Sequence, residues 1–318
     1  MKAEIDWMGL WYKIIKERGE NDRPNFGKYD LETGLVDWLT FSHADMDGVG
    51  AMLDFYEKIN LPLKNYPYLK EKKVPNFFER LKIFYRMFFC IKKVKTVWKE
   101  NNFGLEPENH RLIYFNIFSA EETLSIENYC KLNQFSVNAF LMNISSKVLL
   151  KELSINTEGS WTLPVNLRPL LKRENLKSNH SSGILVNIQK DDTPQITHNN
   201  IRTSLKNKEH WGIWWIHQIG KYIGYNAMRF ISNQNAKKYF IIGSFSNLST
   251  WDLPPGHIWV GGAPGSKNFP LSVMLMKANE RLSLSLKIHP FVLKDLDRTK
   301  DILDNLVRAI RHEVDNNS

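Results

Sequence analysis

The sequence has little cysteine, no long apolar run and no low-complexity tract. Its 318 residues include two cysteines, Cys90 and Cys130, which are too few for a disulfide framework and favour a reducing, cytoplasmic location. No apolar stretch reaches the roughly 20 residues that cross a bilayer. The first residues carry acids ahead of a short apolar stretch, unlike a secretory signal. With 42% hydrophobic and 12% aromatic residues, the composition also excludes a disordered chain or a collagen-like repeat.

The net charge of +9 is concentrated in one segment of the chain. Residues 61–100 hold eleven Lys and Arg against three acids, so the rest of the sequence is close to neutral. No nucleic-acid reading motif accompanies this basic segment, and we expect no nucleic-acid partner. The segment suits an anionic membrane face, an acidic carrier protein or a phosphorylated cofactor.

Segments with helical and strand periodicity alternate along the chain, which predicts an α/β protein with mixed sheets. The predicted helices cover residues 5–18, 48–58, 76–100, 119–132, 136–153, 206–231 and 295–313. The predicted strands cover residues 35–42, 111–118, 161–169, 182–189, 238–248, 257–264, 270–278 and 281–290. Residues 19–34 have the composition of a loop, and residues 61–75 that of a linker.

The most informative segment is SHADMDG, residues 42–48, where a predicted strand gives way to a predicted helix. A histidine at such a junction can project into a cleft, and its ordinary pKa suits a general base near neutral pH. A calcium loop is the rival interpretation, with His43, Asp45, Asp47 and Asp54 as ligands. That loop would begin with a histidine, end with Asp instead of Glu and follow a strand, so we expect no metal site.

Two later segments occur in order after SHADMDG: LPVNLRP at 163–169 and GSFSNLS at 243–249. The three together resemble the acyltransferase superfamily of chloramphenicol acetyltransferase, wax ester synthases and condensation domains. The family signature is His-His-x-x-x-Asp-Gly, and Ser42 stands here at the first histidine. The positions that match family motifs are His43, Asp47, Gly48, Arg168, Ser246, Asn247 and Leu248.

The resemblance covers residues 35–51 and most of 110–314. It implies a two-lobed, chloramphenicol-acetyltransferase-like α/β fold of mixed sheets with flanking helices. Relatives have a longer segment before the motif, whereas 42 residues precede His43 here. We therefore expect a shortened N-terminal lobe over residues 1–100, with the motif and a basic aromatic helix, and a C-terminal acyltransferase-like lobe over 101–318.

The resemblance also implies an activity. An acyl group would move from a coenzyme A or carrier-protein thioester to a small-molecule alcohol or amine, with no permanently bound cofactor. His43 would be the general base. Asp47 would pair with Arg168 and, with Gly48, fix the loop that carries His43. The implied residues of the substrate tunnel are Ser42, Asn166, Ser246 and Asn247.

Several alternatives stay open at this point. The second functional hypothesis is that the protein is a catalytically inactive relative. It would act as a binding or assembly module, either free or attached to a membrane. Residues 77–98 suit a core or lobe-crossing helix, a membrane-surface helix or a carrier-docking helix. Because helices 5–18 and 77–98 are more apolar than solvent-exposed helices need to be, we expect a homo-oligomer or peripheral membrane attachment through one of them. The tryptophans at 211, 214 and 215 are expected in the core, and His217 is expected to be structural.

Overall fold

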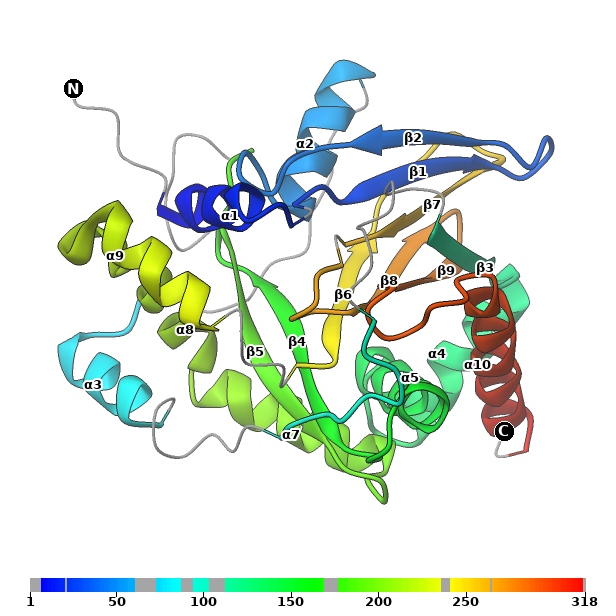
Figure 1. The fold of residues 1–318 in the computed structure, drawn as a ribbon. Helices are drawn as coiled ribbons and strands as arrows, with labels where there is room; N and C mark the ends of the chain where they lie inside the picture. Colours follow the sequence, from blue (N-terminus) through cyan, green and yellow to red (C-terminus); the bar gives the residue numbers. More distant parts are fainter. Residues whose placement is uncertain are drawn as a thin grey trace.

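The computed structural model describes residues 7–20, 22–60, 73–86, 94–102, 112–168, 177–235, 241–263 and 265–316. Its strands form two sheets: a six-stranded mixed sheet in the order β3-β9-β8-β6-β4-β5, and a three-stranded antiparallel sheet in the order β2-β1-β7 (Figure 1). The strands are β1 (Asn25–Asp30), β2 (Val36–Thr40), β3 (Ile113–Ile117), β4 (Gly159–Asn166), β5 (Ser181–Ile188), β6 (Gly243–Thr250), β7 (His257–Gly262), β8 (Leu271–Ala278) and β9 (Arg281–Ile288).

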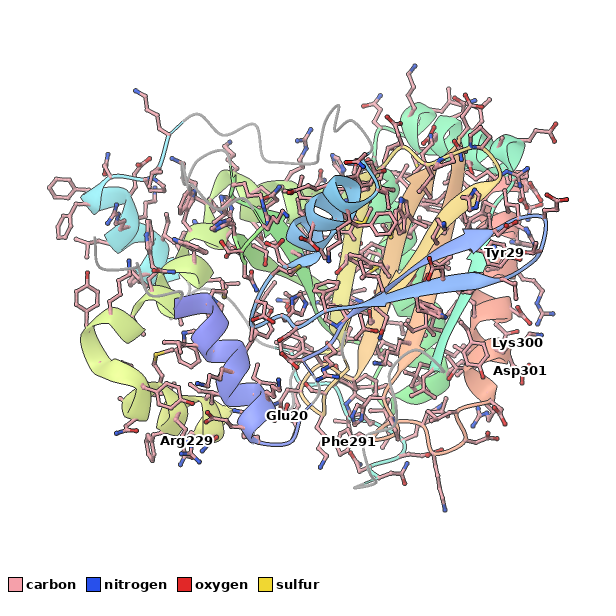
Figure 2. All side chains as sticks on the ribbon, turned by 90° about the horizontal axis from the view of Figure 1, so that it is seen from above. Glu20, Tyr29, Arg229, Phe291, Lys300 and Asp301 are labelled. Atoms are coloured by element: carbon pink, nitrogen blue, oxygen red, sulfur yellow. The ribbon has the colours of Figure 1, made fainter. Side chains whose placement is uncertain are left out.

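Helices gather at both ends of the larger sheet. They are α1 (Trp7–Glu17), α2 (Gly48–Lys58), α3 (Phe77–Tyr85), α4 (Ala120–Leu132), α5 (Val137–Leu153), α7 (Pro194–Lys206), α8 (Glu209–Gln218), α9 (Gly220–Asn235) and α10 (Arg298–Asp315). Figure 1 shows α4, α5 and α10 beside β3 and β9, whereas α1, α3, α8 and α9 lie beyond β5. Figure 2, seen from above, places Arg229 of α9 at the opposite end from Lys300 and Asp301 of α10.

Alternation of apolar residues in β9 builds the main core. Leu282, Leu284, Leu286 and Ile288 are buried and belong to one cluster with side chains of α4, α5 and α10. The neighbouring strand β8 pairs antiparallel with β9 over its full length, and β8 and β6 run parallel. This arrangement confirms the predicted mixed α/β class.

The small sheet draws one strand from far along the chain. β7 follows β6 in sequence but pairs with β1, with Asn25 opposite Gly262 and Tyr29 opposite Ile258. Gly261 permits this approach, because a Cβ there would lie 2.7 Å from the Asn25 carbonyl oxygen. The sheet that precedes the SHADMDG segment therefore contains a strand from the C-terminal part of the chain, and the division at residue 100 stays a prediction.

Three predicted elements need correction. The helix predicted over 206–231 is two helices, α8 and α9, which meet at Ile219. Residues 19–34 are not all loop, because β1 is the central strand of the small sheet and pairs on both edges. Of the predicted helix over 76–100, the structure describes α3 over Phe77–Tyr85, and residues 94–97 have no helical structure. Residues 87–93 of that prediction lie outside the described residues, as do residues 61–72 of the predicted linker. Helix α7 was not predicted; Thr193 caps it and Pro194 starts it.

Candidate functional site

The segment 41–47 connects β2 to α2 and carries the motif residues. Asp47 is the N-cap of α2, and its Oδ1 accepts a hydrogen bond from the Gly50 amide at 2.8 Å. A Cβ at Gly50 would lie 1.9 Å from the Lys177 carbonyl oxygen, so only glycine lets this first turn approach the segment that follows Arg168. The start of α2 is thereby fixed against a distant part of the chain.

The structure brings Asp47 and Arg168 together in a buried, two-pronged ion pair. Arg168 donates to Oδ2 at 2.9 Å and to Oδ1 at 2.5 Å, and the two residues are 2% and 1% exposed. The His180 amide donates to Oδ2 at 2.9 Å. Arg168 donates further to the Ser178 carbonyl at 2.8 Å and to Asn166 Oδ1 at 3.1 Å. With both oxygens engaged, this carboxylate suits a structural task and not proton transfer.

The backbone of His43 is held on both sides. The His43 amide donates to the Asp22 carbonyl at 2.9 Å, and the Asn179 side chain donates to the His43 carbonyl at 3.1 Å. The ring Nδ1 lies 3.2 Å from the Met46 carbonyl oxygen. Because that oxygen can only accept, Nδ1 carries the proton in the neutral ring and Nε2 keeps its lone pair. A lone pair of this kind is what a general base needs.

Aromatic rings enclose the imidazole of His43. Tyr12 of α1 stacks on it with ring centroids 4.7 Å apart and planes 25° apart, and Phe41 meets it edge-on at 6.0 Å. Burial lowers the pKa of His43 below its ordinary value, and the nearby carboxylates of Asp47 and Asp22 only partly oppose that shift. Burial together with the same carboxylates raises the pKa of Tyr12 to about 12. Both rings are therefore neutral near pH 7.

A cavity of about 680 Å³ extends from His43 to the helices beyond β5. Around His43, at what we call the motif end, the lining includes Asp22, His43, Asp47, Gly48, Asn138, Ser246 and Asn247, together with the apolar Phe26, Phe41, Val49 and Leu248. At the other, the helical end, it is lined by Met8, Trp11, Ile15, Leu163, Val165, Leu185, Ile201, Leu205, Ile213, Ile216 and His217. The size falls within the ordinary range of ligand pockets, about 300–1,000 Å³.

The expected tunnel residues divide into two groups. Asn166, Ser246 and Asn247 line the cavity. Ser42 does not line it among the described residues, because its hydroxyl turns to the Asp22 carboxylate and accepts from the Ala44 amide at 3.1 Å. Ser42 thus braces the turn that carries His43, which corrects its assignment to the tunnel.

Four residues near the motif end were missed at the level of sequence. Tyr12 sits in a helix whose apolar spacing was visible, but nothing in the sequence placed that helix against His43. Asp22 and Asn179 hold the backbone of the histidine, and Asn138 accepts from the Asn247 amide. Their role is visible only in the three-dimensional structure, because they contact His43 or Asn247 from distant parts of the sequence.

Two of the three tryptophans of α8 lie in the core, and Trp215 is only partly buried against it. Trp211 and Trp214 are buried in a cluster with Met8, Ile83 and Val165. His217 differs from its structural interpretation, because it lines the cavity. Within the described ranges, no three His, Cys, Asp or Glu side chains gather as a metal site.

Solved structures similar in fold to this chain include a cyclization-docking bidomain, a condensation domain and an acetyltransferase. The EpoB cyclization-docking bidomain from Sorangium cellulosum matches with a TM-score of 0.57 at 13% identity, over 87% of this chain and 59% of its own. The condensation domain of the monacolin K polyketide synthase MokA matches with 0.55 at 11% identity, over 89% and 70%. The chain has the condensation-domain fold.

The same fold occurs in an acetyltransferase. Trichothecene 15-O-acetyltransferase from Fusarium sporotrichioides matches with a TM-score of 0.52 at 13% identity, over 98% of this chain and 75% of its own. No family model matches the sequence, and no curated protein matches it. The expected two-lobed acyltransferase-like fold is therefore confirmed by structure, and the chain spans 59% of the length of the cyclization-docking bidomain.

Proposed function

We propose that this condensation-domain fold transfers an acyl group from a thioester to a hydroxyl or amine, with His43 as the general base. The observation that carries the proposal is the state of His43. Its ring lines the cavity, is neutral near pH 7 and has Nδ1 engaged on the Met46 carbonyl. The lone pair of Nε2 is then the group that accepts a proton.

The reaction balances with the acceptor and the thioester alone. Nε2 of His43 takes the proton of the acceptor hydroxyl or amine while its oxygen or nitrogen attacks the thioester carbonyl carbon. The tetrahedral intermediate collapses, the carbon–sulfur bond breaks, and the proton on Nε2 passes to the departing thiolate. The products are an ester or amide and a free thiol. The thioester is that of coenzyme A or of a carrier-protein pantetheine.

Base catalysis alone contributes about 10²–10⁴-fold, so the site must also stabilise the oxyanion. Ser246 and Asn247 line the same end of the cavity as His43. The Ser246 hydroxyl is one candidate donor; the side-chain NH2 of Asn247 is the other, because it has a second N–H besides the one donated to Asn138. Asp47 and Arg168 act as positioning residues, because their ion pair fixes the N-terminus of α2 behind the histidine.

A catalytically inactive binding module is the second candidate. The observation in its favour is that Tyr12 lies flat on one face of the His43 ring and leaves less of the imidazole open to a substrate. In that case the cavity would bind an acyl thioester without turnover.

The placement of the protein in the cell is a further part of the proposal. Among the described residues, no helix has both the length and the apolar character to span a membrane. We propose a cytoplasmic protein that self-associates or attaches to a membrane surface through α3. Helix α1 is the weaker candidate, because its apolar face is turned into the molecule, with Met8 and Ile14 buried.

Release of free thiol tests the proposed reaction whatever the acceptor is. The purified protein is incubated with a panel of acyl-CoA thioesters, a panel of alcohols and amines, and a thiol reagent. We expect thiol release that falls at least about a hundredfold in His43→Ala. His312→Ala, an exposed histidine of α10, is the matched control and should leave the rate unchanged. Thioester binding without thiol release from any pair would favour the inactive module.

A further inference from the structure

The two ends of the cavity differ in charge. Among the described residues of the lining, the charged side chains are Asp22 and Asp47, and both lie at the motif end beside the neutral rings of His43 and Tyr12. The helical end is formed by aliphatic and aromatic side chains from α1, β4, β5, α7 and α8. A charged part of a ligand has no counter-charge there.

The polar groups at the helical end are also occupied or neutral. Trp11 Nε1 donates to the His217 carbonyl at 2.8 Å, and the Ser182 hydroxyl donates to the His210 carbonyl at 2.6 Å. Burial lowers the pKa of His217 to about 4, so its ring is uncharged at neutral pH. Apart from the buried Nδ1 of His217, which has no hydrogen-bond partner among the described residues, this end of the cavity therefore offers contact area instead of hydrogen bonds.

Helix α1 connects the two ends. Its cavity-lining residues are Met8, Trp11, Tyr12 and Ile15, at the i, i+3, i+4 and i+7 spacing of one helix face. Tyr12 contacts His43, whereas Trp11 contacts His217 with ring centroids 5.9 Å apart. A single continuous surface thus leads from the candidate base into the apolar region.

From this arrangement we propose that the helical end binds the aliphatic chain of a substrate whose reactive group lies at His43. This inference rests on the proposed function, since it names the substrate class of the same site. The chain belongs either to the acyl group of the thioester or to the acceptor alcohol or amine. In both cases α1 and α8 form the wall against which the chain packs and so set the length that fits.

Chain-length dependence of binding is the direct test. Affinity for acetyl-, octanoyl- and dodecanoyl-CoA is measured by calorimetry without acceptor, and affinity for 1-butanol, 1-octanol and 1-dodecanol in a second arm. Each buried methylene should strengthen binding by up to about fourfold in the series that uses the helical end. The series that responds identifies the source of the chain. Affinities that do not rise with chain length in either series would overturn the inference.

A bulky residue in the wall provides the matched comparison. Ile216→Trp fills the cavity from α8, and Ile219→Trp makes the same change three residues on, at an exposed position outside the lining. We expect Ile216→Trp to weaken binding of the twelve-carbon ligand at least tenfold and to leave the shortest ligand unchanged. Ile219→Trp should change neither. Ile15→Trp repeats the test from α1 if thermal unfolding shows that Ile216→Trp does not fold.

Thiol release is recorded in parallel, so that a failure of the proposed acyl transfer can be distinguished from a failure of the proposed chain binding. Thiol release with acetyl-CoA and short acceptors, together with affinities that do not rise with chain length, would support acyl transfer. The same result would contradict the binding of an aliphatic chain at the helical end. Length-dependent binding with no thiol release from any pair would support the chain-binding end and remove the reaction. Equal weakening by Ile216→Trp and Ile219→Trp would also contradict the assignment of the wall.

Discussion

The motif end and the helical end of the cavity are held together by different forces. At the motif end, a buried ion pair fixes Asp47 and Arg168, which are 2% and 1% exposed. Hydrogen bonds fix the backbone of His43. At the helical end, α1, α3 and α8 meet through apolar and aromatic contacts, with Met8, Ile83 and Trp211 in one cluster. Directed bonds fix the position of atoms, whereas apolar packing fixes a shape.

The difference suits the two tasks that we assign. A proton transfer needs an imidazole held within a fraction of an ångström, and hydrogen bonds with fixed geometry supply that. An aliphatic chain needs a wall that is largely apolar and carries no charge. Each prediction below removes one of these features and asks whether the two ends respond differently.

The largest effect on stability is expected from the ion pair. Asp47→Ala and Arg168→Ala should each destabilise the fold by about 3–5 kcal/mol, because each leaves a buried charge without its partner. The double variant should cost clearly less than the sum of the single variants. Denaturant unfolding of the four proteins measures this.

A partly exposed ion pair nearby gives the control for that cycle. Lys177 donates to Asp54 at 2.9 Å, and both side chains are partly exposed to solvent. The same cycle on this pair should give a coupling of about 0–1 kcal/mol. Strict additivity at Asp47 and Arg168 would show that the motif end is not held as described.

The second prediction concerns His217 at the helical end. Burial lowers its pKa to about 4 from an ordinary 6.5, so the unfolded chain binds a proton at higher pH than the native one. Its contribution to stability is therefore complete above pH 6.5 and is lost as pH falls toward 4, by roughly 3 kcal/mol over the full range. The uncharged variant His217→Leu should lose less stability than the wild type between pH 7 and 4.5.

The exposed variant His312→Leu is the control for this pH dependence and should follow the wild type. Unfolding is measured at both pH values in all three proteins. A His217→Leu variant whose loss of stability equals that of the wild type would mean that His217 titrates normally and that the helical end admits charge.

The smallest effect is expected on the outer face of the helical end. Phe77 and Phe78 of α3 are 67% and 79% exposed, with Lys82 on the same helix. Replacing both phenylalanines by serine should weaken self-association or binding to anionic vesicles roughly tenfold, through lost apolar contact. Light scattering and vesicle flotation separate the two modes.

The matched control for α3 is on α4. Leu124 and Leu132 are 57% and 75% exposed there, and Leu124→Ser with Leu132→Ser should change neither measurement. A wild-type protein that stays monomeric and ignores the vesicles would remove α3 as a docking surface.

Local chemistry made several elements predictable from the sequence. Helix α2 begins and ends where the pattern after SHADMDG places it, because Asp47 caps it and its apolar spacing is regular. Helix α4 starts after Ser119, which forms a capping box with Glu122. The alternation in β9 likewise identified a strand with one face in the core. The partnership of Asp47 with Arg168, 121 positions apart, was expected only from the family resemblance.

Other features depend on contacts between distant segments. Pro24, Asn25 and Gly27 are turn residues and predict a loop, but pairing of β1 with β2 and β7 outweighs that composition. The apolar periodicity over 76–100 extends beyond the helix that forms, because Trp98 pairs with Ser154 in an isolated bridge. The stacking of Tyr12 on His43 has no local signal, because it depends on where α1 lies in the fold.

The pH dependence of acyl transfer tests the central claim, that a neutral His43 is the base, most directly. Burial lowers the pKa of this imidazole, so kcat/KM should decline in one protonation step whose midpoint lies below pH 6.5. His43→Ala should lie at least about a hundredfold lower at neutral pH and lack that step. Full activity in His43→Ala, or a decline centred above pH 6.5 in the wild type, would contradict the claim.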